Sequence, residues 1–319
     1  MSARRDYDPR RVRVAVVDIG TNSTRLLIAD VEDGRVHEVD RRSQVTRLGE
    51  GVDATGRLGA EPMRRVLDTL QAYHEAIVER GCDATTGVLT SAVRDAANGA
   101  EFTAEVRTRF DLDVRTIDGD EEARLTFLGA TAGRETPAAG PLLVVDIGGG
   151  STEFVVGPED EVSFHVSTQA GVVRYTERHV HTDPPAPAEL QALVAEVRGV
   201  IADAVPPEVR DGVAAGVAVA GTATSCAAIE QELDPYDPNR VEGYVLELGD
   251  CELLLARLAA MPLAERRTVV GLHPDRAPTI VAGVAILLEA LRAFGLDRVE
   301  VSEHDILWGC AMACIRQVD

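Results

Sequence analysis

The sequence predicts an α/β protein built as two lobes. Its 319 residues correspond to two domains at about 150 residues per domain. A strand-like run ending in Asp, a glycine turn with hydroxyl side chains and a second strand-like run occurs twice, at residues 14–29 and 142–157. Helical and strand-like patterns alternate after each copy, which is typical of helices packed on sheets.

The two copies predict a pair of glycine hairpins. The first reads Val-Ala-Val-Val-Asp-Ile-Gly-Thr-Asn-Ser from Val14, and the second reads Leu-Leu-Val-Val-Asp-Ile-Gly-Gly-Gly-Ser-Thr-Glu from Leu142. Strand-like residues and a turn follow each loop, whereas a helix would follow a Rossmann or P-loop turn. One such loop alone would be typical of an ordinary hairpin with a capping Asp. Two copies instead predict loops that face one cleft, where backbone N–H groups can approach phosphate oxygens.

The remaining elements follow from hydrophobic periodicity and turn signals. We expect strands at 87–90, 114–117, 217–220 and 299–302, and loops at 131–141 and 183–187. We expect a third turn of small residues at Gly221–Thr224. The predicted helices span 61–80, 100–110, 120–129, 189–204, 251–260, 277–294 and 306–316. We expect the first lobe to be 1–130 and the second 131–305, with the last helix, about 306–319, free to pack back on the first lobe.

Composition excludes several functional classes. The chain has 32 basic and 53 acidic residues and a net charge of −21, and every basic residue is Arg. The absence of Lys excludes P-loop lysine and Schiff-base chemistry, and the negative charge argues against a nucleic-acid binder. No apolar run is long enough to span a membrane or to form a signal sequence. Five cysteines without a C-x-x-C pair indicate reduced thiols in a cytoplasmic protein.

Cys310 and Cys314 are spaced i,i+4 on the last predicted helix. This spacing could form half of a metal site, but no other Cys or His pair obviously completes it. Small residues of a buried core are the favoured interpretation.

Five ordered motifs resemble those of the Ppx/GppA phosphatases, which comprise exopolyphosphatases and guanosine pentaphosphate phosphohydrolases. The motifs are Asp18–Arg25, Thr90–Asp95, Asp120–Arg124, Asp146–Glu153 and Gly221–Thr224. The resemblance covers nearly the whole chain, including residues 276–283. It implies a two-lobed actin-like or sugar-kinase-like (ribonuclease H-like) fold with the active-site cleft between the lobes.

The resemblance also implies roles for the carboxylates. It places the water-positioning base at Glu122, with Glu121 as the alternative; without it, both acids would be typical of a helix N-terminus. Asp146 is the first candidate for a metal ligand. Glu153 would support it from behind the metal ligands or through a bridging water, and Asp18 would contribute from the facing loop. The expected ion is Mg²⁺, with Mn²⁺ as the alternative.

Arg94, which we expect to end a strand, and Arg25 are the candidate catalytic cations, although an isolated Arg more often forms a surface ion pair. The expected phosphate-binding residues lie in the glycine loops and in the third turn. They are Gly20, Thr21, Asn22, Ser23, Gly148, Gly149, Gly150, Ser151, Thr152, Gly221 and Thr222.

One segment departs from the family pattern. At residues 302–309 an Asp, Asp305, replaces a glycine, and Leu307 and Trp308 replace an Arg–Glu pair. Any polar contact that the family makes there is therefore in doubt. The chain also ends soon after the second lobe, which leads us to expect shorter polyphosphate chains or a nucleotide end as substrate, or weaker processivity.

The first expectation for function is an exopolyphosphatase that releases terminal phosphate from inorganic polyphosphate. The alternative is hydrolysis of guanosine pentaphosphate (pppGpp) to the tetraphosphate. A less favoured alternative is a polyphosphate/ADP phosphotransferase, because the two loops resemble the ATP-binding hairpins of sugar kinases. Another is a non-catalytic phosphate sensor, because a net charge of −21 would slow the approach of a polyanion substrate. Polyphosphate or pppGpp is the expected partner, with no membrane and no nucleic acid, and the resemblance suggests a homodimer.

Overall fold

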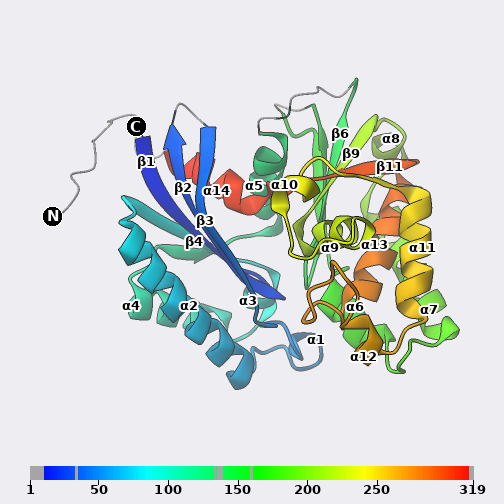
Figure 1. Cartoon of the computed structure of the whole chain (residues 1–319), viewed down its shortest axis with the longest axis horizontal. Coiled ribbons are helices and arrows are strands. Elements are labelled where there is room, and N and C mark those ends of the chain that lie inside the picture. The colour runs from blue at the N-terminus through cyan, green and yellow to red at the C-terminus, as the bar shows by residue number, and fades with distance from the viewer. Residues whose placement is uncertain (1–10, 33–34, 133, 135–138, 159–160, 316–319) are drawn as a thin grey trace.

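The computed structural model describes residues 11–32, 35–132, 134, 139–158 and 161–315. Two sheets, one in each lobe, lie on either side of a pair of helices (Figure 1). The predicted α/β fold of two lobes is confirmed. The charged N-terminus, much of the predicted loop at 131–141 and the last residues of the predicted terminal helix lie outside the described residues.

The first-lobe sheet has the strand order β3-β2-β1-β4-β5. β1 pairs antiparallel with β2 and parallel with β4, so the hairpin lies beside a parallel pair. Apolar β-branched residues fill β1, which is buried along most of its length as a central strand requires. The strands are β1 (Arg11–Ile19), β2 (Ser23–Glu32), β3 (Arg35–Val45), β4 (Ala84–Leu89) and β5 (Val114–Thr116).

The second-lobe sheet repeats this arrangement. Its order is β10-β11-β9-β6-β7-β8, with β6 antiparallel to β7 and parallel to β9. β6 therefore corresponds to β1, and the duplication seen in the two loops extends through both sheets. The strands are β6 (Leu142–Ile147), β7 (Thr152–Gly157), β8 (Phe164–Thr168), β9 (Ala215–Val219), β10 (Val245–Glu247) and β11 (Arg298–Val301).

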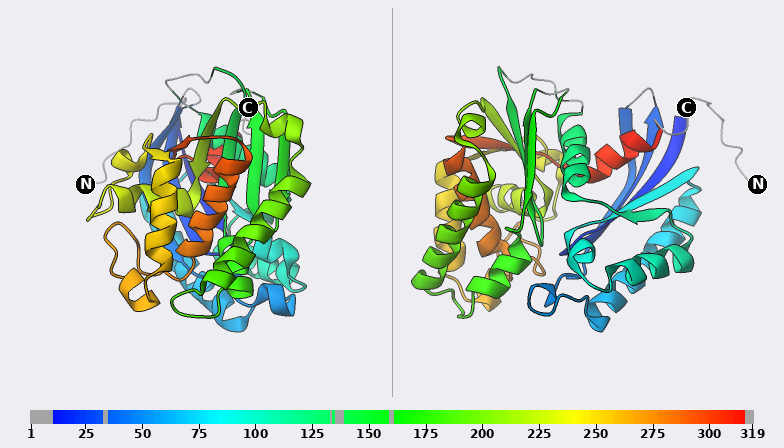
Figure 2. Two further views of the ribbon diagram at one scale, coloured as in Figure 1. Left: turned by 90° about the vertical axis from the view of Figure 1, so that its right-hand side faces the viewer. Right: turned by 180° about the vertical axis from the view of Figure 1, so that it is seen from behind.

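Helices cover the outer face of each sheet (Figure 2). In the first lobe, the apolar stripe of the long helix α2 packs on β1 and β2. In the second, α13 is buried on almost every side. The helices are α1 (Val52–Thr55), α2 (Ala60–Arg80), α3 (Ser91–Asp95), α4 (Gly99–Phe110), α5 (Gly119–Thr131), α6 (Val172–His179), α7 (Pro187–Ala204), α8 (Pro207–Arg210), α9 (Ala220–Glu230), α10 (Pro238–Val241), α11 (Leu248–Ala259), α12 (Leu263–Arg266), α13 (Ile280–Ala293) and α14 (Ile306–Ile315).

Two helices, α5 and α14, lie between the sheets (Figures 1 and 2). α5 follows the first-lobe sheet and packs on the second-lobe sheet through residues such as Phe127. α14 follows the second-lobe sheet and packs on β1 and β2 through residues such as Leu307 and Trp308. Each helix thus connects one lobe to the sheet of the other.

The crossing of α5 and α14 depends on two glycines. A Cβ on Gly129 would collide with the Asp305 carbonyl, and one on Gly309 would collide with the Leu125 carbonyl. The helices can therefore approach backbone to backbone only because glycine stands at both positions. This crossing fixes the segment 302–309, where the sequence departs from the family pattern, against the helix that carries Glu122.

Two sequence predictions about local structure are wrong. Arg94 does not end a strand, because β4 ends at Leu89 and Arg94 lies on α3. Residues Gly221–Thr224 are not a turn but the first part of α9, which begins at Ala220 with a positive φ of 63°. β3 also escaped prediction, since its charged and partly exposed residues lack the apolar alternation of a half-buried strand.

Cys310 is buried in the core formed by α14, β1 and β2, and Cys314 packs against that core. This placement agrees with the core interpretation of the pair. In the part of the chain that the structure describes, no helix is long and apolar enough to cross a membrane.

Candidate active site

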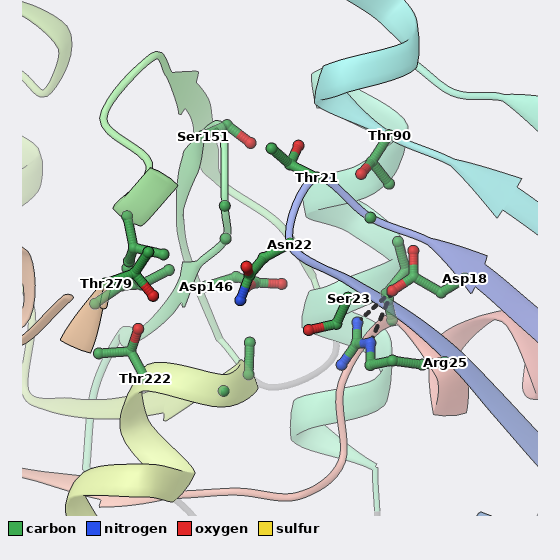
Figure 3. Close-up of a pocket in the computed structure, with 18 of the residues that line it drawn as sticks. Asp18, Thr21, Asn22, Ser23, Arg25, Thr90, Asp146, Ser151, Thr222 and Thr279 are labelled. Carbon is green, nitrogen blue, oxygen red and sulfur yellow. Dashed lines mark hydrogen bonds and ion pairs between the residues drawn. The ribbon is translucent and has the colours of Figure 1, made fainter. Parts of the chain in front are cut away.

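The two glycine loops are hairpin tips, as predicted. In each tip, the N–H of the first glycine donates to the carbonyl of the serine three residues later. The distance is 3.0 Å both from Gly20 to Ser23 and from Gly148 to Ser151. The tips meet across the lobes (Figure 3). A Cβ on Gly149 would lie 2.8 Å from the Asn22 nitrogen, so glycine is required for this approach.

One cleft between the tips collects most of the predicted site residues. The predicted residues that line it are Asp18, Gly20, Thr21, Asn22, Ser23, Arg25, Glu122, Asp146, Gly148, Gly149, Ser151, Gly221 and Thr222. Lining residues that the sequence analysis did not assign are Thr90, Ile147, Val172, Ala220, Arg276, Thr279, Ile280 and Ile306.

Four predicted residues do not line this cleft. Gly150 lies behind the tip, against Ser91 and Thr21. The Thr152 hydroxyl donates to the Ala170 carbonyl, so it is not turned toward a ligand. Glu153 and Arg94 stand one layer further back: Glu153 accepts from Ser167, and Arg94 donates to Glu122.

Glu122 lies in the first turn of α5 at the edge of the cleft. Its side chain is 10% exposed, and its Oε2 accepts from Arg94 Nη1 at 2.9 Å. Arg94 also donates to the Ile117 carbonyl at 3.1 Å, so it supports Glu122 from behind. Burial raises the pKa of Glu122 to about 7; the Arg94 charge opposes this shift, and Asp146 and Asp18 add to it. Such a carboxyl can accept a proton near neutral pH.

The neighbouring acid, Glu121, is placed differently. It forms an ion pair with Arg115 on the outside of the helix, and its side chain is 27% exposed. Between the two candidates for the base, only Glu122 lines the cleft. One residue along the helix rotates a side chain by about 100°, which is why the sequence alone left both open.

The strand-end aspartates have opposite environments. Asp18 faces Arg25 across the β1–β2 ladder, and Asp146 faces Glu153 across the β6–β7 ladder. Asp18 is therefore paired with a cation, whereas Asp146 lies beside another acid. Burial raises the pKa of Asp146 to about 7, with further contributions from Asp305 and Asp18 against the opposing charge of Arg25.

Glu153 completes a group of buried acids. It accepts from Ser167 Oγ at 2.7 Å, and burial together with the charges of Glu122 and Asp146 raises its pKa. One oxygen of Asp18, Oδ1, is also buried without a hydrogen-bond partner. Buried acids that share a region without enough positive charge are the chemistry expected where a hard cation binds. Among the described residues, however, no three His, Cys, Asp or Glu side chains converge closely enough to hold a metal by themselves.

Arg25 is fully engaged. Its Nε donates to Asp18 Oδ2 at 2.8 Å (Figure 3), and its Nη1 pairs with Asp305. Burial lowers the pKa of Arg25, but the charges of Asp305 and Asp18 outweigh this, so the pKa is raised overall. This candidate catalytic cation thus lies at the cleft but already has two carboxylate partners.

Arg276 is the cation that the sequence analysis left without a role. It follows the short turn after His273 and presses its guanidinium against Gly221, where any Cβ would collide. Burial and the charge of Arg25 lower the pKa of Arg276, and Tyr236 and Glu303 offset only part of this. A partly buried cation short of counter-charge at the cleft is suited to an anionic ligand. Residue 276 lies in the segment 276–283 of the family resemblance, but the sequence does not show that its side chain reaches the cleft, because the glycine that makes room for it lies in α9.

Ion pairs also join the lobes beside the cleft. Arg174 on α6 pairs with Asp53 and, at 2.9 Å, with Asp95, both in the first lobe. Its Nε donates to the Gly150 carbonyl at 3.1 Å. One guanidinium therefore holds the second glycine loop and the facing lobe together.

Comparisons with known proteins agree with this geometry. The model of the Ppx/GppA phosphatase family matches residues 27–309. Exopolyphosphatase 2 of Mycobacterium tuberculosis is 37% identical over 318 residues, which cover 94% of this chain and 98% of that protein.

Solved structures give the same result. The crystal structure of the Aquifex aeolicus member of the Ppx/GppA family is 31% identical, with a TM-score of 0.81 over 97% of this chain and 99% of that one. An exopolyphosphatase from Cytophaga hutchinsonii is 27% identical, with a TM-score of 0.86 over 96% of this chain and 99% of that one. The resemblance found in the motifs is confirmed, and the chain belongs to the Ppx/GppA phosphatase family.

Proposed function

We propose that the protein is an exopolyphosphatase, which hydrolyses the terminal phosphoanhydride bond of inorganic polyphosphate with Glu122 as the base that orients water. The observation that carries this proposal is the position of Glu122. It is buried at the edge of a cleft formed by two glycine hairpins, its pKa is raised to about 7, and Arg94 holds it in place. The relatives named exopolyphosphatase support the same substrate.

The hairpins supply the donors for the phosphate. Backbone N–H groups at Gly20 and Gly148 are already used within their turns, so the N–H groups that follow them in the two tips would be the donors to the ligand. Ser23, Ser151 and Thr222 contribute hydroxyl groups at the cleft, and Arg276 contributes charge. Phosphoryl transfer depends mainly on such positioning and on neutralising the equatorial oxygens.

The residues of the cleft fit Mg²⁺, with Mn²⁺ as the alternative. Mg²⁺ usually keeps several waters and binds through one or two carboxylates together with substrate phosphates, so a three-carboxylate cage is not required. Asp146 would hold the ion, the unpartnered Oδ1 of Asp18 would accept from its waters, and Glu153 would support Asp146 from the neighbouring strand. When bound, the ion would neutralise charge on the phosphates.

A specific observation favours pppGpp as the second candidate substrate. Ile147, Val172, Ile280 and Ile306 line part of the cleft, and a chain of phosphates makes no use of apolar side chains, whereas a nucleoside does. The terminal anhydride of pppGpp would meet the same catalytic groups.

The experiment measures phosphate release from long polyphosphate and from pppGpp with Mg²⁺, alongside phosphate transfer from polyphosphate to ADP. Glu122→Gln is expected to lose about 10²- to 10⁴-fold in turnover while still binding tripolyphosphate. The matched control is Glu121→Gln, which makes the same change on the outer face of the same helix and should retain activity. Turnover that survives in Glu122→Gln would remove this residue from the mechanism. Faster phosphate transfer to ADP than to water would show that the protein is a phosphotransferase rather than a hydrolase. No wild-type turnover with Mg²⁺ or Mn²⁺ would favour a phosphate sensor.

We also infer a cytoplasmic location from the state of the cysteines. The five cysteines, all of which lie in the described part of the chain, form no disulfide with one another, which suits a reducing compartment. The homodimer suggested by the family resemblance is tested by the mass of the protein in solution.

A further inference from the structure

The guanidinium of Arg25 lies between two buried carboxylates. Its side chain is 16% exposed, and those of Asp18 and Asp305 are 5% and 1% exposed. One positive and two negative charges give this group a net charge of −1 at the wall of a cleft for polyanions. Of the three residues, Asp18 and Arg25 line the cleft directly, and Asp305 contacts Arg25 from behind.

Asp305 is held firmly in this position. One oxygen, Oδ1, accepts from the Leu307 N–H at 3.0 Å and so caps the first turn of α14, while Oδ2 pairs with Arg25. Its own carbonyl is pressed against Gly129 of α5. A carboxylate fixed on both oxygens and by its backbone cannot swing away when a ligand arrives.

The position of Asp305 makes Arg25 unlike Arg276. Both guanidinium groups line the cleft, but Arg25 has two acidic partners, whereas Arg276 lacks full compensation. A phosphate oxygen that approaches Arg25 must compete with carboxylates that are already desolvated and hydrogen bonded. Arg25 therefore contributes little attraction to the ligand as long as Asp305 is charged.

We propose that Asp305 is a specificity-determining residue that acts through Arg25: it keeps this guanidinium paired and so weakens the hold of the cleft on highly charged phosphate chains. This inference rests on the proposed function, since it concerns the affinity of the same cleft for its substrate. Asp305 is a positioning residue rather than a catalytic one, because it does not line the cleft itself. Loss of its charge leaves Arg25 with one partner and frees its remaining N–H groups for phosphate oxygens.

The test measures binding of inorganic tripolyphosphate by calorimetry in the Glu122→Gln background, where hydrolysis does not interfere. Asp305→Asn keeps an oxygen to cap α14 but removes the charge, and it should bind tripolyphosphate about three- to tenfold more tightly. In the active enzyme, the same change should lower KM for polyphosphate without raising kcat. Asp305→Ser, which also caps helices but is too short to reach Arg25, should behave in the same way and provides a second variant if the first is unstable.

The control is Asp30→Asn, which neutralises another buried Asp on β2, one that pairs with Arg11 and Arg13 outside the cleft. It should leave tripolyphosphate binding unchanged. A double-mutant cycle with Arg25→Gln tests whether the effect of Asp305 depends on Arg25. The gain in tripolyphosphate affinity from Asp305→Asn should vanish when Arg25 is absent. Unchanged or weaker binding by folded Asp305→Asn, or a gain that persists without Arg25, would overturn the inference. Binding that responds as expected in a protein that does not hydrolyse polyphosphate would instead refute only the proposed function.

Discussion

Arg94 Nη1 lies 2.9 Å from Oε2 of Glu122, and this contact opposes the burial that raises the pKa of the carboxyl to about 7. Activity should therefore rise with pH through about 7, as Glu122 loses its proton. In Arg94→Gln the opposing charge is gone, so the pKa of Glu122 should rise further and the profile of kcat/KM should move about one unit toward higher pH. A profile that stays in place while activity falls would mean that Arg94 acts on the substrate instead.

Glu122 should also make the protein less stable as the pH rises. Its pKa is raised in the folded state to about 7 from an ordinary value of 4.5, so the folded state binds more protons between these values and stability is lost across that window. Glu122→Gln carries no such charge. At pH 8 the free energy of unfolding of this variant should exceed that of the wild type by on the order of 1–3 kcal/mol. The difference should vanish near pH 4. Urea unfolding at the two pH values measures this; an equal difference at both would contradict it.

The contact between the glycine tips predicts a strong effect of a single methyl group. A Cβ at Gly149 would lie 2.8 Å from both the Asn22 nitrogen and Thr21 Cβ, so Gly149→Ala should force the tips apart and raise KM for polyphosphate. Gly199→Ala is the control, because Gly199 lies in α7 with nothing within 4 Å of the added carbon. It should keep its activity and gain about 0.5–1 kcal/mol in stability. Thermal unfolding and steady-state kinetics of both variants make the comparison.

Arg174 should control how the lobes close. Its ion pairs with Asp53 and Asp95 cross from one lobe to the other, so Arg174→Gln should lower kcat/KM and increase the radius of gyration in solution scattering. The matched variant is Arg64→Gln, which removes two ion pairs on the exposed face of α2. Exposed pairs of that kind contribute little, so this variant should behave like the wild type. Equal behaviour of the two variants would show that the crossing pairs do not hold the lobes.

Arg276 should bind the phosphate chain. Its guanidinium lines the cleft with incomplete counter-charge, and a hydrogen bond to a charged group contributes about 1.5–3 kcal/mol. Arg276→Gln should therefore raise KM for polyphosphate about 10- to 100-fold. The control, Arg240→Gln, removes an exposed charge in the same lobe and should have no such effect. A normal KM in Arg276→Gln would exclude contact with the substrate.

The parts of the molecule that local sequence determines were predictable. The two glycine hairpins follow from apolar runs, strand-end Asp residues and glycine turns, and most helices follow from their periodicity. The repeat of the whole sheet could be inferred only in outline, because β3 carries charges on its partly exposed residues and β8 is short. The start of α9 at Ala220 was missed, since small residues there are equally compatible with a turn.

Side-chain partners that are distant in sequence could not be predicted. Asp305 reaches Arg25 only because the glycine contacts of α5 and α14 bring the end of the chain beside β2. Arg276 reaches the cleft only because Gly221 leaves room for it. Family resemblance indicated Glu122, but its burial and its separation from Glu121 depend on the packing of α5 between the sheets.

The backbone crossing of α5 and α14 has a mechanical consequence. Since Gly129 and Gly309 let the two helices touch at their main chains, the two lobes are in backbone contact at this crossing. A side chain at either glycine would force the helices apart. Asp305 meets Gly129 at this crossing, and Glu122 lies about two turns of α5 away from it. A rotation of one lobe against the other about this crossing would therefore displace Asp305 less than the parts of the lobes that lie far from it.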